Sequence, residues 1–206
     1  MLSGIAWSSF SQVIQALLSA AAMLVLVRII PPADYGEAAV VVSFLAVFNA
    51  FAFDHFASQS LQLKEGEVPD WGIHFSFGFF LQSALFILAN LLALGMRFTE
   101  SYKSIAPLLH VASIVLILSW PMQIRLNMLK RALDFRRLRL LQVAGTTISI
   151  AVSLTLGLLG KGAYAIVLSN ALAGVPFVID LALFSEWKPP RGWWKWRDWS
   201  GYRQST

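Results

Sequence analysis

The chain of 206 residues contains no cysteine and few charged residues, and both shortages restrict its function. Without cysteine it has no disulfide, no thiolate nucleophile and no cysteine-based metal site. Charged residues make up only 13% of the sequence, whereas soluble domains carry about 25%. Hydrophobic residues make up 57%. This composition indicates a protein whose main solvent is lipid.

Charge is missing altogether from six long stretches of the sequence. They are residues 1–27, 38–53, 71–96, 104–124, 140–160 and 162–179. A helix of about 20 residues crosses the ~30 Å hydrocarbon core of a bilayer. A soluble domain of this size would have too little polar chain to cover six such segments. The sequence therefore predicts an all-α integral membrane protein with six transmembrane helices.

The charged and turn-forming residues set the expected bounds of these helices. The predicted spans are about 5–30, 37–56, 71–96, 105–128, 138–159 and 163–184. Pro121 is expected to kink the end of the fourth span, and Gly160 and Gly162 to form a tight turn before the sixth. Residues 1–186 are thus predicted to form one transmembrane lobe. Residues 187–206, rich in tryptophan and basic residues, are predicted to lie on the cytoplasmic face of the membrane.

The distribution of Lys and Arg predicts the orientation in the membrane. If the N-terminus is cytoplasmic, 12 of the 16 basic residues fall in cytoplasmic segments. This excess favours a multi-pass protein with both termini in the cytoplasm. It also explains the net charge of +5 by contact with anionic membrane lipids rather than with nucleic acid. No cleavable signal peptide is expected, because the first basic residue is Arg28.

The sequence contains no recognisable catalytic motif. Its three histidines, His55, His74 and His110, do not have the spacing of metal ligands. There is no nucleophile elbow and no glycine-rich phosphate loop. We therefore expect neither an enzyme nor a bound cofactor or metal ion.

Polar side chains within or at the ends of the predicted spans are the candidates for function, because burying them in lipid is unfavourable. The candidates for substrate contact in the second span and its end are Asn49, Asp54, His55 and Gln59. Candidates for binding a coupling ion are Asp54, His55 and Asp180. Further polar residues of the spans are Gln82, Asn90 and Asn170. The alternative for each is interhelical hydrogen bonding or an interfacial position.

A basic segment, residues 125–139, connects the fourth and fifth predicted spans. Its cations anchor the cytoplasmic side according to the positive-inside rule. Arg125, Lys130 and Arg131 are also candidates for recruiting an anionic, lipid-linked substrate through charge-assisted hydrogen bonds to phosphate. These two roles are compatible.

Four patches of the sequence resemble, in the same order, the exporters of polysaccharide biosynthesis. These are the O-antigen and exopolysaccharide lipid flippases of the multidrug/oligosaccharidyl-lipid/polysaccharide superfamily. The patches are VRIIPPADYG at 27–36, GIAWSSFSQV at 4–13, LDFRRL at 133–138 and GKGAYAIVL at 160–168. Pro32, Asp34 and Gly36 of the first patch are expected to shape a loop, with Gly36 releasing the chain.

The resemblance implies a function in transport across the bacterial inner membrane. Such a transporter moves a polyprenyl-pyrophosphate-linked oligosaccharide from the cytoplasmic to the periplasmic leaflet, by alternating access between two six-helix lobes. Arg28 matches the arginine of the family signature, which makes it a further candidate for substrate binding in the cavity. The expected partners are the lipid-linked oligosaccharide and membrane lipids, with no nucleic acid.

The family's exporters have about twelve to fourteen spans, whereas this chain has six predicted spans. The chain therefore corresponds to their N-terminal lobe. It is expected to be a fragment, to pair with a second copy or a separately encoded lobe, or to have lost transport. Two alternatives to transport stay open: a lobe that acts as an interaction or scaffold protein, and a membrane enzyme acting on polyprenol-linked sugars through a residue such as Asp54 or His55.

Overall fold

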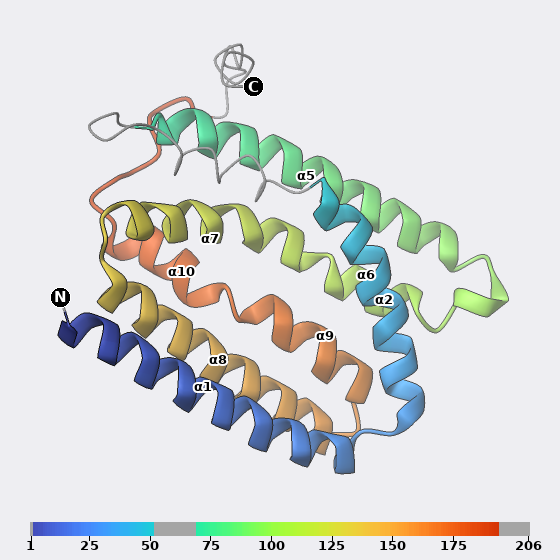
Figure 1. Cartoon of the computed structure of the whole chain (residues 1–206). Coiled ribbons are helices and arrows are strands. Elements are labelled where there is room, and N and C mark those ends of the chain that lie inside the picture. The colour runs from blue at the N-terminus through green and yellow to red at the C-terminus, as the bar shows by residue number, and fades with distance from the viewer. Residues whose placement is uncertain (1, 52–68, 194–206) are drawn as a thin grey trace.

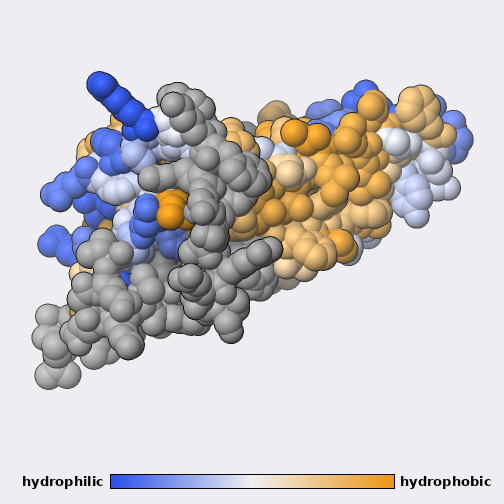
Figure 2. All heavy atoms as spheres, turned by 90° about the horizontal axis from the view of Figure 1, so that it is seen from above, coloured by the Kyte–Doolittle hydropathy of each residue, from blue (hydrophilic) through white to orange (hydrophobic). Residues whose placement is uncertain are grey.

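The computed structural model describes residues 2–51 and 69–193, with side chains from residue 12 onward (Figure 1). All regular elements of this part of the chain are helical. Six helical segments within it are long and apolar enough to cross a membrane. Figure 2 shows a hydrophobic band between two hydrophilic ends. The chain is thus a multi-pass helical membrane protein, which confirms the predicted fold class.

The described residues contain eight α-helices and two short helical turns. In chain order they are α1 (Leu2–Ile29), α2 (Pro32–Ala50), α5 (Trp71–Met96), the 3-10 turn η1 (Glu100–Tyr102), α6 (Ala106–Ala112), α7 (Ile114–Arg131), α8 (Phe135–Leu158), α9 (Gly162–Leu172), α10 (Val175–Ile179) and the π-helical turn η2 (Asp180–Phe184). Helices α6 and α7 together make the fourth span, and α9, α10 and η2 make the sixth.

Several helix ends lie where local sequence signals predict them. Helix α5 has the predicted bounds, and Asp70 caps it by accepting hydrogen bonds from the backbone N–H groups of Gly72 and Ile73 at 2.9 and 3.1 Å. The predicted turn before the sixth span is confirmed. Gly160 adopts a left-handed φ of 70°, and the Lys161 N–H donates to the carbonyl of Leu156 at 2.9 Å.

Residues 32–36, which belong to the first of the four resembling patches, are helical and do not form a loop. Helix α2 begins at Pro32, so Asp34 lies in its first turn and Gly36 in the turn that follows. A proline fits the first helical position because its missing N–H would have no helical partner there. The expectation that these residues shape a loop is therefore wrong. The end of the predicted second span, residues 52–56, lies outside the described residues.

The fourth and sixth spans each contain an interruption that the sequence does not predict. The fourth span breaks at Ser113, whose hydroxyl donates to the carbonyl of His110 at 2.7 Å and so competes with regular helix bonding. Pro121, the expected kink site, lies within α7, eight residues after Ser113. The sixth span breaks at Ala173 and Gly174, between α9 and α10.

Helix α8 lies at the centre of one side of the bundle, where it packs against α1, α9, α10 and α7 (Figure 1). Helix α5 packs mainly against α7, and α2 crosses the bundle to contact α9 and α6. The span in α1 has only 6% of its residues buried, so most of its surface is available to lipid or to another protein.

The two ends of the bundle contain different connections. The start of α1, the α7–α8 connection and the end of η2 lie at one end, and the α1–α2 and α8–α9 connections lie at the other (Figure 1). The first and last helical residues therefore lie at the same end of the bundle, as an even number of spans requires. We call the end with the α7–α8 connection the basic end.

An aromatic cluster joins the first turns of α5 and the first half of α7 to the chain that follows η2. Phe75 of α5 meets Trp120 of α7 edge-on, with ring centroids 4.2 Å apart. Trp193 stands edge-on to Phe75 and to Phe79, both at 4.9 Å. The backbone carbonyl of Trp193 also accepts a hydrogen bond from the Ser76 hydroxyl. The chain up to residue 193 is thus held against the lobe.

Candidate functional site

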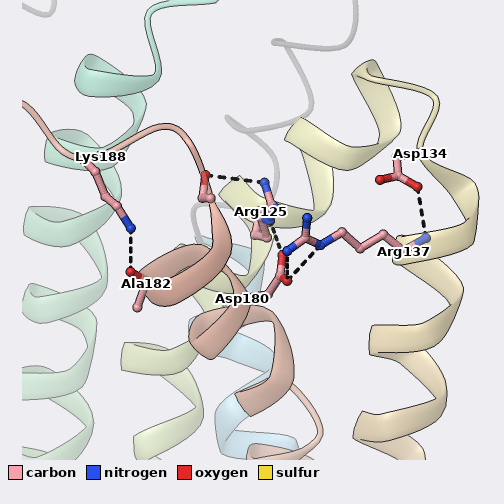
Figure 3. A network of polar contacts seen from close by, with 7 residues as sticks. Arg125, Asp134, Arg137, Asp180, Ala182 and Lys188 are labelled. Carbon is pink, nitrogen blue, oxygen red and sulfur yellow. Dashed lines mark hydrogen bonds and ion pairs between the residues drawn. The ribbon is translucent and has the colours of Figure 1, made fainter.

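Two arginines and one aspartate from three separate elements converge at the basic end. Arg125 comes from α7, Arg137 from the first turn of α8, and Asp180 is the first residue of η2. Arg125 Nε donates to Asp180 Oδ2 at 2.5 Å. Arg137 Nε and Nη2 both donate to Asp180 Oδ1, at 2.9 and 2.7 Å (Figure 3). We call these three residues the ionic triad.

The ionic triad combines deep burial with unequal charge. The side chains of Arg125 and Asp180 are 9% and 6% exposed, whereas that of Arg137 is 37% exposed. Removing charges from water is unfavourable unless they are paired and hydrogen-bonded. Two guanidinium groups share one carboxylate, so the triad has one net positive charge. Its exposed member, Arg137, can therefore attract a further anion.

Short contacts hold the elements around the triad in place. The Asp134 carboxylate accepts from the backbone N–H of Arg137 at 3.0 Å and so caps α8. The Lys188 ammonium donates to the carbonyl of Ala182, within the π-helical turn, at 2.7 Å (Figure 3). The guanidinium of Arg137 lies 6.0 Å from the centre of the Phe184 ring. The triad thus links the α7–α8 connection to the end of the sixth span.

The structure brings together only some of the candidate residues. Arg125 and Asp180, predicted as a substrate contact and a coupling-ion site respectively, bind each other directly. Lys130 is exposed at the basic end, and Arg131 is half-buried there. Arg28 is exposed in the last turn of α1, at the opposite end of the bundle. The candidates that lie outside the described residues are Asp54, His55 and Gln59.

Arg137 is not among the site residues predicted from the sequence. It lies in the basic segment, but nothing in that segment distinguishes it from the adjacent Arg136, which is exposed. One local signal points to Arg137. Asp134 is a typical helix N-cap residue, which predicts a helix that begins at Phe135 and has Arg137 in its first turn. Identifying its partner required the position of Asp180.

A second polar feature lies far from the triad, on the surface of the spans. Helices α2, α6, α7 and α9 enclose an open hollow of about 210 Å³. Its walls are apolar except for the carboxamides of Asn49 and Asn170. Both asparagines are exposed, and neither has a hydrogen-bond partner within the described residues. Asn49 is thus placed opposite a residue of the sixth span, in a hollow and not beside Arg125.

Of the other polar residues predicted in the spans, Asn90 forms hydrogen bonds between helices and Gln82 is buried. Asn90 of α5 bonds to His110 Nδ1 of α6 at 2.6 Å and to the Ser113 hydroxyl at 3.0 Å. This network ties the third span to the break in the fourth, as interhelical hydrogen bonding predicts. Gln82 is fully buried, and its carboxamide has no partner in the part of the chain that the structure describes.

Comparison with known proteins identifies the family. No curated protein and no solved structure matches the chain. The sequence profile of a family described as polysaccharide biosynthesis protein matches residues 25–200, which is most of the chain and includes all three residues of the triad. The six-span lobe with its basic end thus belongs to the polysaccharide biosynthesis protein family.

Proposed function

We propose that the chain is one lobe of a flippase that moves a polyprenyl-diphosphate-linked oligosaccharide across the bacterial inner membrane, with the basic end in the cytoplasm. The protein acts as a transporter and not as an enzyme in this proposal. The observation that carries it is the ionic triad in a membrane-spanning lobe of the polysaccharide biosynthesis family.

The chemistry of the triad supports recognition of a diphosphate. Guanidinium groups bind phosphate oxygens in the same two-pronged way as carboxylate oxygens. Arg137 is partly exposed, and the triad has a surplus positive charge. An incoming diphosphate can approach Arg137 while Asp180 continues to pair with Arg125. Lys130, exposed at the same end, adds to the attraction.

Alternating access requires a second unit, because one lobe must rock against another around the bound substrate. The lobe therefore works beside a second set of spans, supplied by a second copy or by another polypeptide. The surface of α1, which is largely unburied within the lobe, is available for such contacts.

A translocation assay with two matched variants tests the proposal. The protein is reconstituted with its second unit in vesicles that contain fluorescent polyprenyl-diphosphate-linked oligosaccharide, and a membrane-impermeant quencher reports the substrate in the outer leaflet. We expect R137Q to reduce the rate by about 10-fold or more, because charge-assisted hydrogen bonds contribute about 1.5–3 kcal/mol. R136Q removes the same charge one residue earlier, at an exposed position, and should retain most of the activity.

The outcomes separate the claims. Translocation by the unaltered protein at the rate of empty vesicles would contradict the proposed transport. Equal losses in R137Q and R136Q would mean that only the total charge of the basic end matters, and the triad would have no specific role.

A further inference from the structure

Two walls of the hollow that contains Asn49 and Asn170 lie about half a bilayer thickness from the helix starts at one end of the bundle. Asn170 lies eight residues after Gly162, the first residue of α9, which is about 12 Å along the helix. Val115, on the opposite wall, lies nine residues after Ala106, the first residue of α6, or about 14 Å. Since the hydrocarbon core is ~30 Å thick, both walls are near its midplane.

Both interrupted spans break beside this hollow. Ala112 and Val115 are lining residues on either side of the break at Ser113. Asn170 and Ala171 are lining residues just before the break between α9 and α10. Ser113, Ala173 and Gly174 keep right-handed helical backbone angles, so each interruption is a local irregularity in a span that continues across the membrane.

The break in the sixth span is held by close packing. A Cβ atom added at Gly145 of α8 would overlap the carbonyl oxygen of Ala173. One added at Gly174 would lie 2.6 Å from the sulfur of Met122. Glycine at both positions allows α8 and α7 to approach the interruption, so the break is built into the packing of the lobe.

The two asparagines require a polar occupant. An exposed carboxamide without a hydrogen-bond partner is unfavourable in hydrocarbon. Each carboxamide offers two N–H donors and one carbonyl acceptor, which match hydroxyl and acetamido groups. The walls are otherwise apolar and uncharged, so a neutral ligand fits this hollow better than a diphosphate does.

We propose that the hollow is a subsite for one neutral sugar unit of the translocated oligosaccharide. Asn49 and Asn170 form hydrogen bonds to its hydroxyl or acetamido groups, and the apolar walls contact the C–H faces of the ring. The volume of about 210 Å³ suits a single sugar unit and not a whole oligosaccharide. This inference rests on the proposed function, and it separates sugar recognition at the midplane from diphosphate recognition at the basic end.

The absence of cysteine from the sequence makes a direct test possible, because an introduced cysteine is the only thiol. N170C places a thiol in the hollow. L88C is the matched control: Leu88 lies eight residues before the end of α5, as Asn170 lies eight residues after the start of α9, and it is 54% exposed. The full chain in membranes is treated with a water-soluble maleimide, which reacts with the thiolate only where water reaches it.

Adding one of two lipids to the labelling reaction shows whether a sugar or a diphosphate occupies the hollow. One is the lipid-linked oligosaccharide extracted from the source cells, and the other is polyprenyl diphosphate without sugar. We expect N170C to react at least 10-fold faster than L88C, and only the saccharide-bearing lipid to slow this reaction. N49C should behave as N170C does.

Three results would overturn the subsite. Labelling of N170C as slow as that of L88C would mean that lipid or protein covers the hollow. Fast labelling that neither lipid slows would mean that it holds water alone. Equal protection by both lipids would assign it to the diphosphate or the polyprenyl chain.

Retention of the radiolabelled saccharide-bearing lipid by the purified protein is measured in the same samples. If the lipid is retained and N170C is not protected, the subsite fails while the proposed function stands. If the lipid is not retained at all, the proposed function fails and the subsite fails with it.

Discussion

The ionic triad and the midplane hollow are two polar regions of one lobe, and they satisfy their polar groups in opposite ways. At the basic end, Asp180 receives three hydrogen bonds from two arginines. In the hollow, Asn49 and Asn170 have no partner within the described residues. Groups that are already paired stabilise the lobe, whereas groups that lack partners are available to a ligand. The comparison therefore predicts different consequences for stability when each region is altered.

The largest effect is expected at the centre of the triad. D180N removes the carboxylate that pairs with both the buried guanidinium of Arg125 and that of Arg137. Breaking one partner out of a buried ion pair typically destabilises a protein by about 3–5 kcal/mol. Thermal unfolding in detergent should show this loss directly. A D180N protein as stable as the unaltered one would mean that water already solvates both arginines.

A smaller effect is expected at the packing that holds the break in the sixth span. G145A places a methyl group against the carbonyl of Ala173 and should destabilise the lobe by about 1–3 kcal/mol. The matched control is G36A: Gly36 lies in α2 with no atom within 4 Å of an added Cβ. That substitution should stabilise the helix by about 0.5–1 kcal/mol. Opposite signs in the same unfolding measurement are the expected result, and equal signs would contradict the packing argument.

A modest effect is expected where α5 is tied to the break in the fourth span. N90A removes the hydrogen bonds to His110 and Ser113. Interhelical hydrogen bonds in membranes contribute about 0.6 kcal/mol on average. The free energy of unfolding should fall by roughly that amount for each bond. If N90A lowered the free energy of unfolding as much as D180N does, this network would contribute as much to stability as the triad.

The smallest effect on stability is expected in the hollow. N170A removes no hydrogen bond within the described residues, so the free energy of unfolding should change by less than about 0.5 kcal/mol. Translocation should nevertheless fall several-fold, because the sugar unit loses a partner. Large destabilisation by N170A would show that its carboxamide is already paired in the folded protein, and the contrast between the two regions would disappear.

Much of the fold was predictable from local signals in the sequence. The six spans follow from uncharged stretches of bilayer length, and Asp70 and Gly160 mark helix ends through their own hydrogen bonding and backbone conformation. The interruption at Ser113 was not predictable in the same way. Pro121 is the stronger local signal, but α7 continues through it while Ser113 is engaged by Asn90 of another helix.

The candidate site was predictable only in its residue types. The basic segment predicts Arg125 as a contact for an anionic substrate, and its position within the sixth span predicts Asp180 as a polar residue of functional importance. Their pairing was not predictable, because each is 55 residues from the other in sequence and several cations compete for the same carboxylate. The choice of Arg137 over Arg136 depends on which side of α8 faces η2.

The sequence by itself determined the solvent, the number of spans and the chemical types at each end, because hydrophobicity and charge act over each segment independently of its neighbours. The tertiary structure alone decided which polar groups meet. It assigned Asp180 to two arginines and left Asn49 and Asn170 facing a hollow, because pairing depends on how helices from distant parts of the chain pack and on where two of the spans break.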